Sequence, residues 1–289
     1  MRFTSFDDLL AKGKALISKG PLALIFVEDE VEINTTLRHH VDLGFDQVIA
    51  FMPKSFKMAY DVSEDVIRVD CEHTSGQPMI DMVNKVAKHA PGVWLYYCFN
   101  AEYLLFPFCE TRTIGEMLAF HTEERRSSML TYVVDLYADD LREHQNAVSI
   151  ENALLDKTGY YALGRQDPDN HDHPKDRQLN FYGGLRWRFE EHIPQVRRKI
   201  DRISIFKATE EVEMRPDFTL TDEEMNTFSC QWHNNLTASV CSFRTAKALK
   251  TNPGSTFDIP SFKWHNSVPF EWHSRQLLDL GLMEPGQWF

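Results

Sequence analysis

The strongest constraint on the fold is a short apolar run, Pro21–Val27, followed at once by a helical pattern and then by a second apolar run. A continuous β-branched run of this length after Gly20 is typical of a strand buried on both faces of a parallel sheet. In Glu32–Leu43 the apolar residues recur at helical spacing, and Gly44 follows as a stop signal. With Gln47–Met52 as the next strand, this unit predicts a right-handed crossover in a doubly wound sheet.

The alternation of strand and helix continues through the first hundred residues. Val66–Val69 and Val93–Cys98 predict two further strands, and Pro78–His89 predicts the helix between them. Ligands in such sheets gather at the carboxyl ends of the strands. The segments in which we expect binding residues are therefore Glu28–Glu30, Met52–Phe56, Asp70–His73 and Phe99–Glu102.

The remainder of the chain has weaker periodicity. A helix is predicted near Thr113–Phe120 and a strong strand at Met129–Tyr137, whereas Gly164–Asn180 has no apolar periodicity and predicts a long surface loop. Met1–Lys19 predicts a short amphipathic helix. The elements predicted in the last third are two strands and two helices, at Ile203–Lys207, Ala238–Phe243, Thr245–Lys250 and Glu271–Leu280.

The charge and the composition exclude some classes of binding partner. The formal net charge of -12 argues against a nucleic-acid backbone or an anionic membrane surface as the main partner, because both favour a basic face. No run approaches the roughly 20 apolar residues of a transmembrane helix, and the N-terminus has no apolar signal core. The five cysteines include no CxxC pair. Reduced thiols in the cytoplasm are the simplest expectation.

Two segments carry a resemblance to a known family. Val27–Phe51 (VEDEVEINTTLRHHVDLGFDQVIAF) resembles the start of the family 2 glycosyltransferases, and Trp94–Pro107 (WLYYCFNAEYLLFP) resembles the segment in which that family carries its metal-binding aspartates. In that register Phe99 and Ala101 stand in place of the two aspartates, and Glu102 keeps the acid. The first segment matches the family at Val27, Asp29, Glu30, His40, Leu43, Gly44, Phe45 and Asp46.

The resemblance implies a GT-A-like (Rossmann-like) α/β fold, with a mainly parallel sheet flanked by helices and an irregular C-terminal extension. It implies one integrated domain, with an N-terminal amphipathic helix at 1–20, a nucleotide-sugar-binding half at 21–145 and an acceptor-side half with the extension at 146–289. The expected donor is a nucleotide diphosphate sugar, and the expected acceptor is a carbohydrate or another hydroxyl compound.

The resemblance also implies binding residues. Asp29, Glu30, Ser55 and Glu102 are the expected donor-binding residues at the strand ends, although Glu30 could instead cap the following helix. Phe262–Leu277 resembles the family's C-terminal histidine motif, so His265 with Glu102 is the candidate site for Mn²⁺ or Mg²⁺. A single remaining carboxylate is a weak magnesium site, and transfer without a metal ion stays open.

Further candidates come from the residues themselves. Asp135 and Asp139 follow a hydrophobic strand and could deprotonate an acceptor hydroxyl, or Asp135 could be a buried structural residue. Arg186 and Arg188 could clamp a diphosphate, or form salt bridges. The remaining two candidates, for acceptor binding by ring stacking and amide hydrogen bonds, or for aromatic packing, are Trp264 and Asn266.

The tract Asp167–Asp176 (DPDNHDHPKD) concentrates acids and histidines in the manner of a metal loop. It lacks the calcium-loop register and the helical spacing of paired histidines, so a solvated loop is the favoured interpretation.

Two hypotheses follow. The first, which we favour, is a hexosyltransferase-type glycosyltransferase, with or without a metal ion. The second is a non-catalytic carbohydrate-binding or scaffolding protein, because two ligand segments, at Met52–Lys54 and at Phe99 with Ala101, depart from the family pattern. A nucleotidyltransferase would need a glycine-rich phosphate loop, and the sequence has none.

Overall fold

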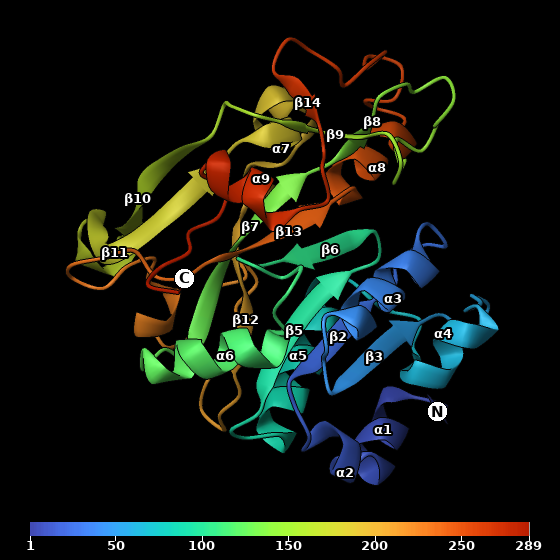
Figure 1. The fold of residues 1–289 in the computed structure, drawn as a ribbon, viewed down its shortest axis with the longest axis vertical. Helices are drawn as coiled ribbons and strands as arrows, with labels where there is room; N and C mark the ends of the chain where they lie inside the picture. The colour runs from blue at the N-terminus through green and yellow to red at the C-terminus, as the bar shows by residue number, and fades with distance from the viewer. Residues whose placement is uncertain (289) are drawn as a thin grey trace. The chain divides into compact units, whose positions relative to one another are not determined.

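The apolar runs of the first hundred residues become parallel strands in the computed structural model, which describes residues 1–288 (Figure 1). The chain divides into two units by its internal contacts. Unit 1 comprises Met1–Tyr103, Thr111–Met129 and Ile203–Asn226, and unit 2 comprises Leu104–Glu110, Leu130–Arg202 and Thr227–Phe289.

The helices and strands follow in chain order. The α-helices are α1 (Phe6–Lys12), α2 (Lys14–Ile17), α3 (Ile33–Asp42), α4 (Tyr60–Asp65), α5 (Gly76–His89), α6 (Ile114–Glu123), α7 (Gly184–Arg188), α8 (Arg244–Thr251) and α9 (Ser274–Asp279). The strands are β1 (Arg2–Phe3), β2 (Leu22–Phe26), β3 (Gln47–Met52), β4 (Val66–Asp70), β5 (Trp94–Phe99), β6 (Glu102–Leu105), β7 (Ser128–Asp135), β8 (Tyr137–Ala138), β9 (Ala153–Asp156), β10 (Tyr161–Asp167), β11 (His173–Tyr182), β12 (Asp201–Lys207), β13 (Ala238–Ser242) and β14 (Ser267–Pro269).

In unit 1 the strands are neighbours in the order β1-β4-β3-β2-β5-β12. All of these pairs are parallel except the last, in which β12 runs antiparallel to β5. Every residue of β2 is buried, as its apolar run predicts for a strand covered on both faces. The mixed α/β fold with a mainly parallel sheet flanked by helices is therefore confirmed.

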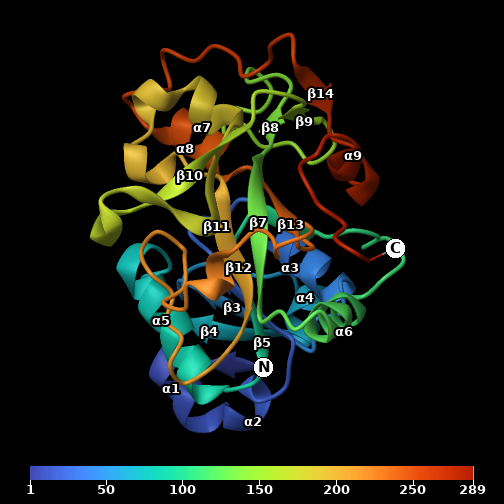
Figure 2. The same ribbon diagram turned by 90° about the vertical axis from the view of Figure 1, so that its left-hand side faces the viewer.

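Helices cover both faces of the unit 1 sheet. Figure 2 shows α1 and α5 on one side of these strands and α3, α4 and α6 on the other. This division follows from right-handed crossovers, because the chain moves outward from β2 through β3 to β4 and then returns to place β5 on the other side of β2. The sheet is thus doubly wound, as predicted.

Two predictions for the secondary structure were wrong. The segment Met1–Lys19 contains two short helices, separated at Gly13 and preceded by β1, instead of one helix. The segment Gly164–Asn180 lies mostly within the antiparallel hairpin β10–β11, instead of a long loop. The first four residues of β10 are exposed on both faces, so a buried-and-exposed alternation could not reveal the strand.

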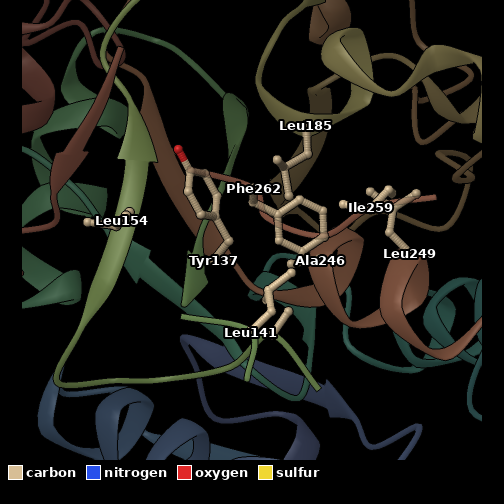
Figure 3. Packing of buried hydrophobic residues seen from close by; sticks show 9 residues of the cluster. Tyr137, Leu141, Leu154, Leu185, Ala246, Leu249, Ile259 and Phe262 are labelled. Carbon is tan, nitrogen blue, oxygen red and sulfur yellow. The ribbon is translucent and has the colours of Figure 1, made fainter. Parts of the chain in front are cut away.

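In unit 2, β13 runs parallel to β7, and β14, β9 and β8 form a small antiparallel sheet. A hydrophobic cluster packs against these elements. In Figure 3 the ring of Phe262 lies among Leu185, Ala246 and Ile259, with Tyr137 beside it. Among the described residues, no helix is long and apolar enough to cross a membrane.

Helix α3 packs on the unit 1 sheet through a buried histidine. The Nδ1 of His40 lies 2.7 Å from the carbonyl oxygen of Thr36 and therefore donates to it, and its ring stacks on Tyr96 at a centroid distance of 5.2 Å. Burial, together with the neighbouring His39, lowers the pKa of His40 from 6.5 to about 3. The imidazole is neutral in the folded protein at neutral pH.

This burial predicts an acid-sensitive contribution to stability. A lowered pKa in the folded state means that the unfolded chain takes up a proton first, so stability is lost as the pH falls from 6.5 towards about 3. The free energy of unfolding of the wild type, minus that of His40→Asn, should fall by about 1.4 kcal/mol per pH unit in this range. Urea unfolding at several pH values measures this difference in unfolding free energy. The control is His89→Asn, on the exposed surface of α5. A difference that does not change with pH would contradict a neutral buried His40.

Candidate functional site

The strand order of unit 1 places a topological switch point between β2 and β5. Strand β2 is parallel to both neighbours, and Phe26 at its carboxyl end pairs with Phe51 of β3 and Phe99 of β5. After β2 the chain continues to β3, on one side of the β2–β5 pair, whereas after β5 it continues to strands on the other side of this pair. Crevices outside such switch points are where open α/β sheets bind their ligands. The candidate site is therefore the edge formed by Val27–Glu32 and Asn100–Glu102, which we call the switch edge.

The switch edge is held by one buried amide. The Oδ1 of Asn100 accepts from the backbone N–H of Glu28 at 2.8 Å, and its Nδ2 donates to the carbonyl of Val31 at 2.8 Å and to the Oδ1 of Asp29 at 2.7 Å. A third contact of Nδ2, at 3.1 Å, reaches the carbonyl of Asp29. The Asn100 side chain is fully buried and its partners are half-buried, so these contacts are partly shielded from water and fix the loop after β2.

The predicted donor-binding acids occupy different positions on this edge. Asp29 is half-buried, and its Oδ1 also accepts from the N–H of Val31 at 2.9 Å. Glu30 is exposed, and it is not the helix cap, because Glu32 occupies the N-cap position of α3. Asp29 is thus oriented by the protein, whereas Glu30 faces solvent.

Glu102 is the first residue of β6, directly after the turn that follows β5. It is fully buried, and its carboxylate accepts from the N–H of Phe99 at 3.0 Å. Ala101 has a left-handed backbone (φ 58°), and its N–H donates to the Oγ1 of Thr36 at 2.8 Å. Phe99, at the first of the two substituted positions, is buried and packs near Phe26. These contacts give the segment a structural role, and the donor-binding and metal roles of Glu102 stay predictions.

The next two strand ends form a second part of the edge around Arg68. Its guanidinium is buried and donates to the carbonyls of Pro53, Lys54 and Phe56 and to the Oδ1 of Asp70. Burial alone would raise the pKa of Asp70, but hydrogen bonds from Arg2 and Arg68 outweigh it and lower the pKa. The segment that contains the exposed Ser55 is held in place in this way.

A pocket of about 510 Å³ opens beside these residues. It presents two cations, Arg2 and Lys54, and two acids, and its lining consists of Arg2, Thr4, Lys54, Asp70, Cys71 and Glu72. Asp70 is already paired with Arg2 and Arg68, with Arg2 Nη2 at 2.6 Å. Lys54 is exposed, so its ammonium group would pair with an anionic ligand in this pocket.

In unit 2, the two predicted clamp arginines are each paired with a buried aspartate. The backbone N–H of Arg186 donates to the Oδ2 of Asp135 at 3.3 Å, and its guanidinium Nε lies 3.5 Å from the other carboxylate oxygen. Arg188 bridges both carboxylate oxygens of Asp156, at 3.1 and 3.2 Å. The guanidinium forks are thus committed to internal ion pairs.

Asp156 is the centre of this network, and the sequence prediction missed it. It is 1% exposed and also accepts from Tyr137 Oη at 2.5 Å and from Trp264 Nε1 at 2.7 Å. The Arg188 guanidinium lies 4.5 Å from the centroid of the Trp264 ring. The available signal was the short apolar run Ala153–Leu155 that ends in an acid. Trp264 is thus held by a hydrogen bond and by a ring contact.

Asp135 and Asp139 differ in their exposure to solvent. Asp135 is 1% exposed, and burial raises the pKa of its carboxyl although Arg186 opposes this shift. Gly184 lies close by, since a Cβ built on it would be 3.0 Å from Asp135 Oδ2. Asp139 is half-buried. Of the two predicted bases, only Asp139 retains solvent contact.

The remaining candidates lie at the surface of unit 2. His265 is exposed, with its ring 4.7 Å from that of Trp264, and the carbonyl of the half-buried Asn266 accepts from the N–H of Lys157. The tract Asp167–Asp176 forms the tip of the β10–β11 hairpin and part of β11. Across residues 1–288, no group of three or more histidine, cysteine, aspartate or glutamate side chains is arranged to hold a metal ion.

Comparison with known proteins adds no family assignment. No protein-family model matches the chain, and no curated protein matches it either. The resemblance to the family 2 glycosyltransferases therefore stays a hypothesis that rests on the two motifs.

We predict that Asn100 is essential for the switch edge. Asn100→Ala should reduce the free energy of unfolding by about 1–3 kcal/mol, because it leaves a half-buried N–H and half-buried carbonyl groups without their partner. Urea unfolding followed by circular dichroism measures the loss. Asn234→Ala, at an exposed position, is the control, and equal losses in the two variants would show that the Asn100 amide does not hold the edge.

The Asp156 network predicts that substitutions within it lower the stability of the protein strongly and non-additively. Asp156→Ala and Arg188→Ala should each destabilise the protein by about 3–5 kcal/mol, because each leaves a buried charge without its partner. The double variant should lose less than the sum of the two. Thermal and urea unfolding measure this cycle. The surface pair Asp140 and Arg142 provides the control cycle, in which the coupling should be far smaller. Additive losses at Asp156 and Arg188 would contradict the network.

Proposed function

We propose that this chain is a glycosyltransferase that binds a nucleotide diphosphate sugar at the switch edge and transfers the sugar to a hydroxyl acceptor. The observation that carries the proposal is the coincidence of two features. The motif segments Val27–Asp46 and Trp94–Pro107 resemble a sugar-nucleotide transferase, and the strand order brings the ends of their strands, β2 and β5, together at the switch point of the sheet.

The chemistry of the edge supports a hydroxyl-rich ligand. Carboxylates accept hydrogen bonds from ribose and sugar hydroxyls, and Asp29 is pre-positioned for this by Asn100. Lys54 lines the neighbouring pocket and supplies an exposed cation for a phosphate group, whereas Arg2 in the same pocket is already paired with Asp70. A pre-formed loop avoids the cost of ordering it when the ligand binds.

The residues at the metal-motif positions do not fit a divalent ion. Phe99 and Ala101 offer no carboxylate, and the Glu102 carboxylate is buried and accepts from the N–H of Phe99. Hard cations require several oxygen ligands, so the proposal assigns no step to a metal ion. In the transfer, the acceptor oxygen would bond to the anomeric carbon, the bond to the diphosphate would break, and a base would take the acceptor proton.

The alternative is a carbohydrate-binding protein without transferase activity. The engagement of Arg186 and Arg188 in buried ion pairs favours it, because these guanidinium groups are then committed within unit 2. The two functions differ in one measurable respect, since both bind a sugar ligand but only a transferase turns it over.

Titration calorimetry with UDP- and GDP-sugars, with and without Mn²⁺, tests the proposal. We expect saturable binding of at least one donor, weakened about tenfold or more by Glu30→Ala or Lys54→Ala, since one hydrogen bond to a charged group contributes on the order of 1.5–3 kcal/mol. Glu64→Ala and Lys19→Ala change exposed residues near the amino ends of β4 and β2, at the opposite edge of the sheet, and are the matched controls.

Two outcomes contradict the proposal. If no donor binds under either condition, nucleotide-sugar recognition fails altogether. If a donor binds but is neither hydrolysed nor transferred to any sugar acceptor, the non-catalytic alternative holds. Loss of turnover in Asp139→Asn, with Asp140→Asn as the control, would support Asp139 as the base.

A further inference from the structure

The hairpin β10–β11 in unit 2 has an unusual outer edge. Strand β10 pairs antiparallel with β11, and within the described residues it pairs with no other strand (Figure 1). Its first four residues, Tyr161–Gly164, are all exposed, with Tyr161 at 44% and Leu163 at 55%. The outer edge of β10 is therefore accessible along an apolar stretch.

This edge lacks the usual protection against strand pairing. Exposed edges are generally blunted by charges, prolines or bulges, but Tyr161–Gly164 contains no charged residue and no proline. The register irregularity of the hairpin begins at the end of this stretch, between Gly164 and Gln166, so that Arg165 lies at it. The strand is also kept in shape from within, because Tyr161 stacks on Tyr182 of β11 at 5.2 Å. A regular and uncharged edge of this kind is a template for another strand.

We propose that β10 pairs antiparallel with β10 of a second copy of this chain, about a two-fold axis at Leu163. The two hairpins would join into one four-stranded sheet. A two-fold contact requires a surface that is complementary to itself. In this register Leu163 faces Leu163, Ala162 faces Gly164, and Tyr161 faces Arg165 of the second copy.

Charge complementarity favours a second copy as the occupant. The register places no two like charges opposite each other within the strand, although the chain has a net charge of -12. Arg165 faces an aromatic ring, and its charge is already compensated by Asp201 at 2.9 Å. Beyond the strand, the acidic tip that begins at Asp167 runs towards the exposed Lys157 of the second copy. Association of two short strands buries a small area, so the dimer should be weak and concentration-dependent.

Sedimentation velocity over a wide range of protein concentration tests the proposal. The wild type should shift from the mass of one chain towards twice that mass as its concentration rises. Leu163→Lys places two like charges opposite each other at the axis and should keep the protein at the mass of one chain. Val196→Lys makes the same kind of change at an apolar position in unit 2 that is 81% exposed, and it should dimerise as the wild type does.

A cross-linking variant tests the register. Leu163→Cys should form a disulfide between two copies under mild oxidation, because opposite residues in an antiparallel pair bring their Cβ atoms to about 4.5–5.5 Å. The wild type, with its five free cysteines, and Val196→Cys are the controls. If the wild type is monomeric at all concentrations, the proposal is overturned, even if β10 pairs with a strand of another protein. Dimers that survive Leu163→Lys, or that do not cross-link through Leu163→Cys, overturn it equally.

Discussion

The buried amide of Asn100 is the interaction on which the switch edge depends. Parallel strands end at the same edge of a sheet, but the loops after them are free to diverge unless something joins them. Asn100 follows β5 directly and reaches the loop after β2 with both its donor and its acceptor. Its carboxamide has the required combination of groups, because a carboxylate could not donate and an ammonium could not accept. The geometry of Asp29 is a consequence of this contact.

Unit 2 is organised by a different physical rule. A carboxylate that is removed from water must be paired and hydrogen-bonded, and Asp156 satisfies this through Arg188, Tyr137 and Trp264. Asp135 is compensated less completely. Its Oδ1 lacks a hydrogen-bond partner, and so does the buried hydroxyl of Tyr160. The incomplete pairing explains why burial dominates and raises the pKa of Asp135.

Much of the fold of unit 1 could be predicted from the sequence, whereas most of the side-chain contacts could not. The run Leu22–Phe26 is apolar at every position, and this pattern has one physical explanation, burial on both faces. The hairpin strand β10 gives no such signal, because its residues face solvent on both sides. The roles of Arg186 and Arg188 depend on partners more than 30 residues away in the chain, at Asp135 and Asp156. Motif spacing identifies candidate residues, but the pairing of charges is decided by the tertiary structure.

Electrostatics at the switch edge bears on the choice between the two functions. The loop after β2 carries Glu28, Asp29, Glu30 and Glu32 within five residues, and a diphosphate placed beside these acids would be repelled. In metal-dependent transferases a divalent ion removes this conflict, but Phe99 and Ala101 supply no ligand for one. A donor bound here would therefore need its hydroxyl groups on the acidic loop and its phosphates near Lys54, which lines the pocket at the ends of β3 and β4. A neutral carbohydrate has no such requirement, because its hydroxyls can occupy the acidic loop alone.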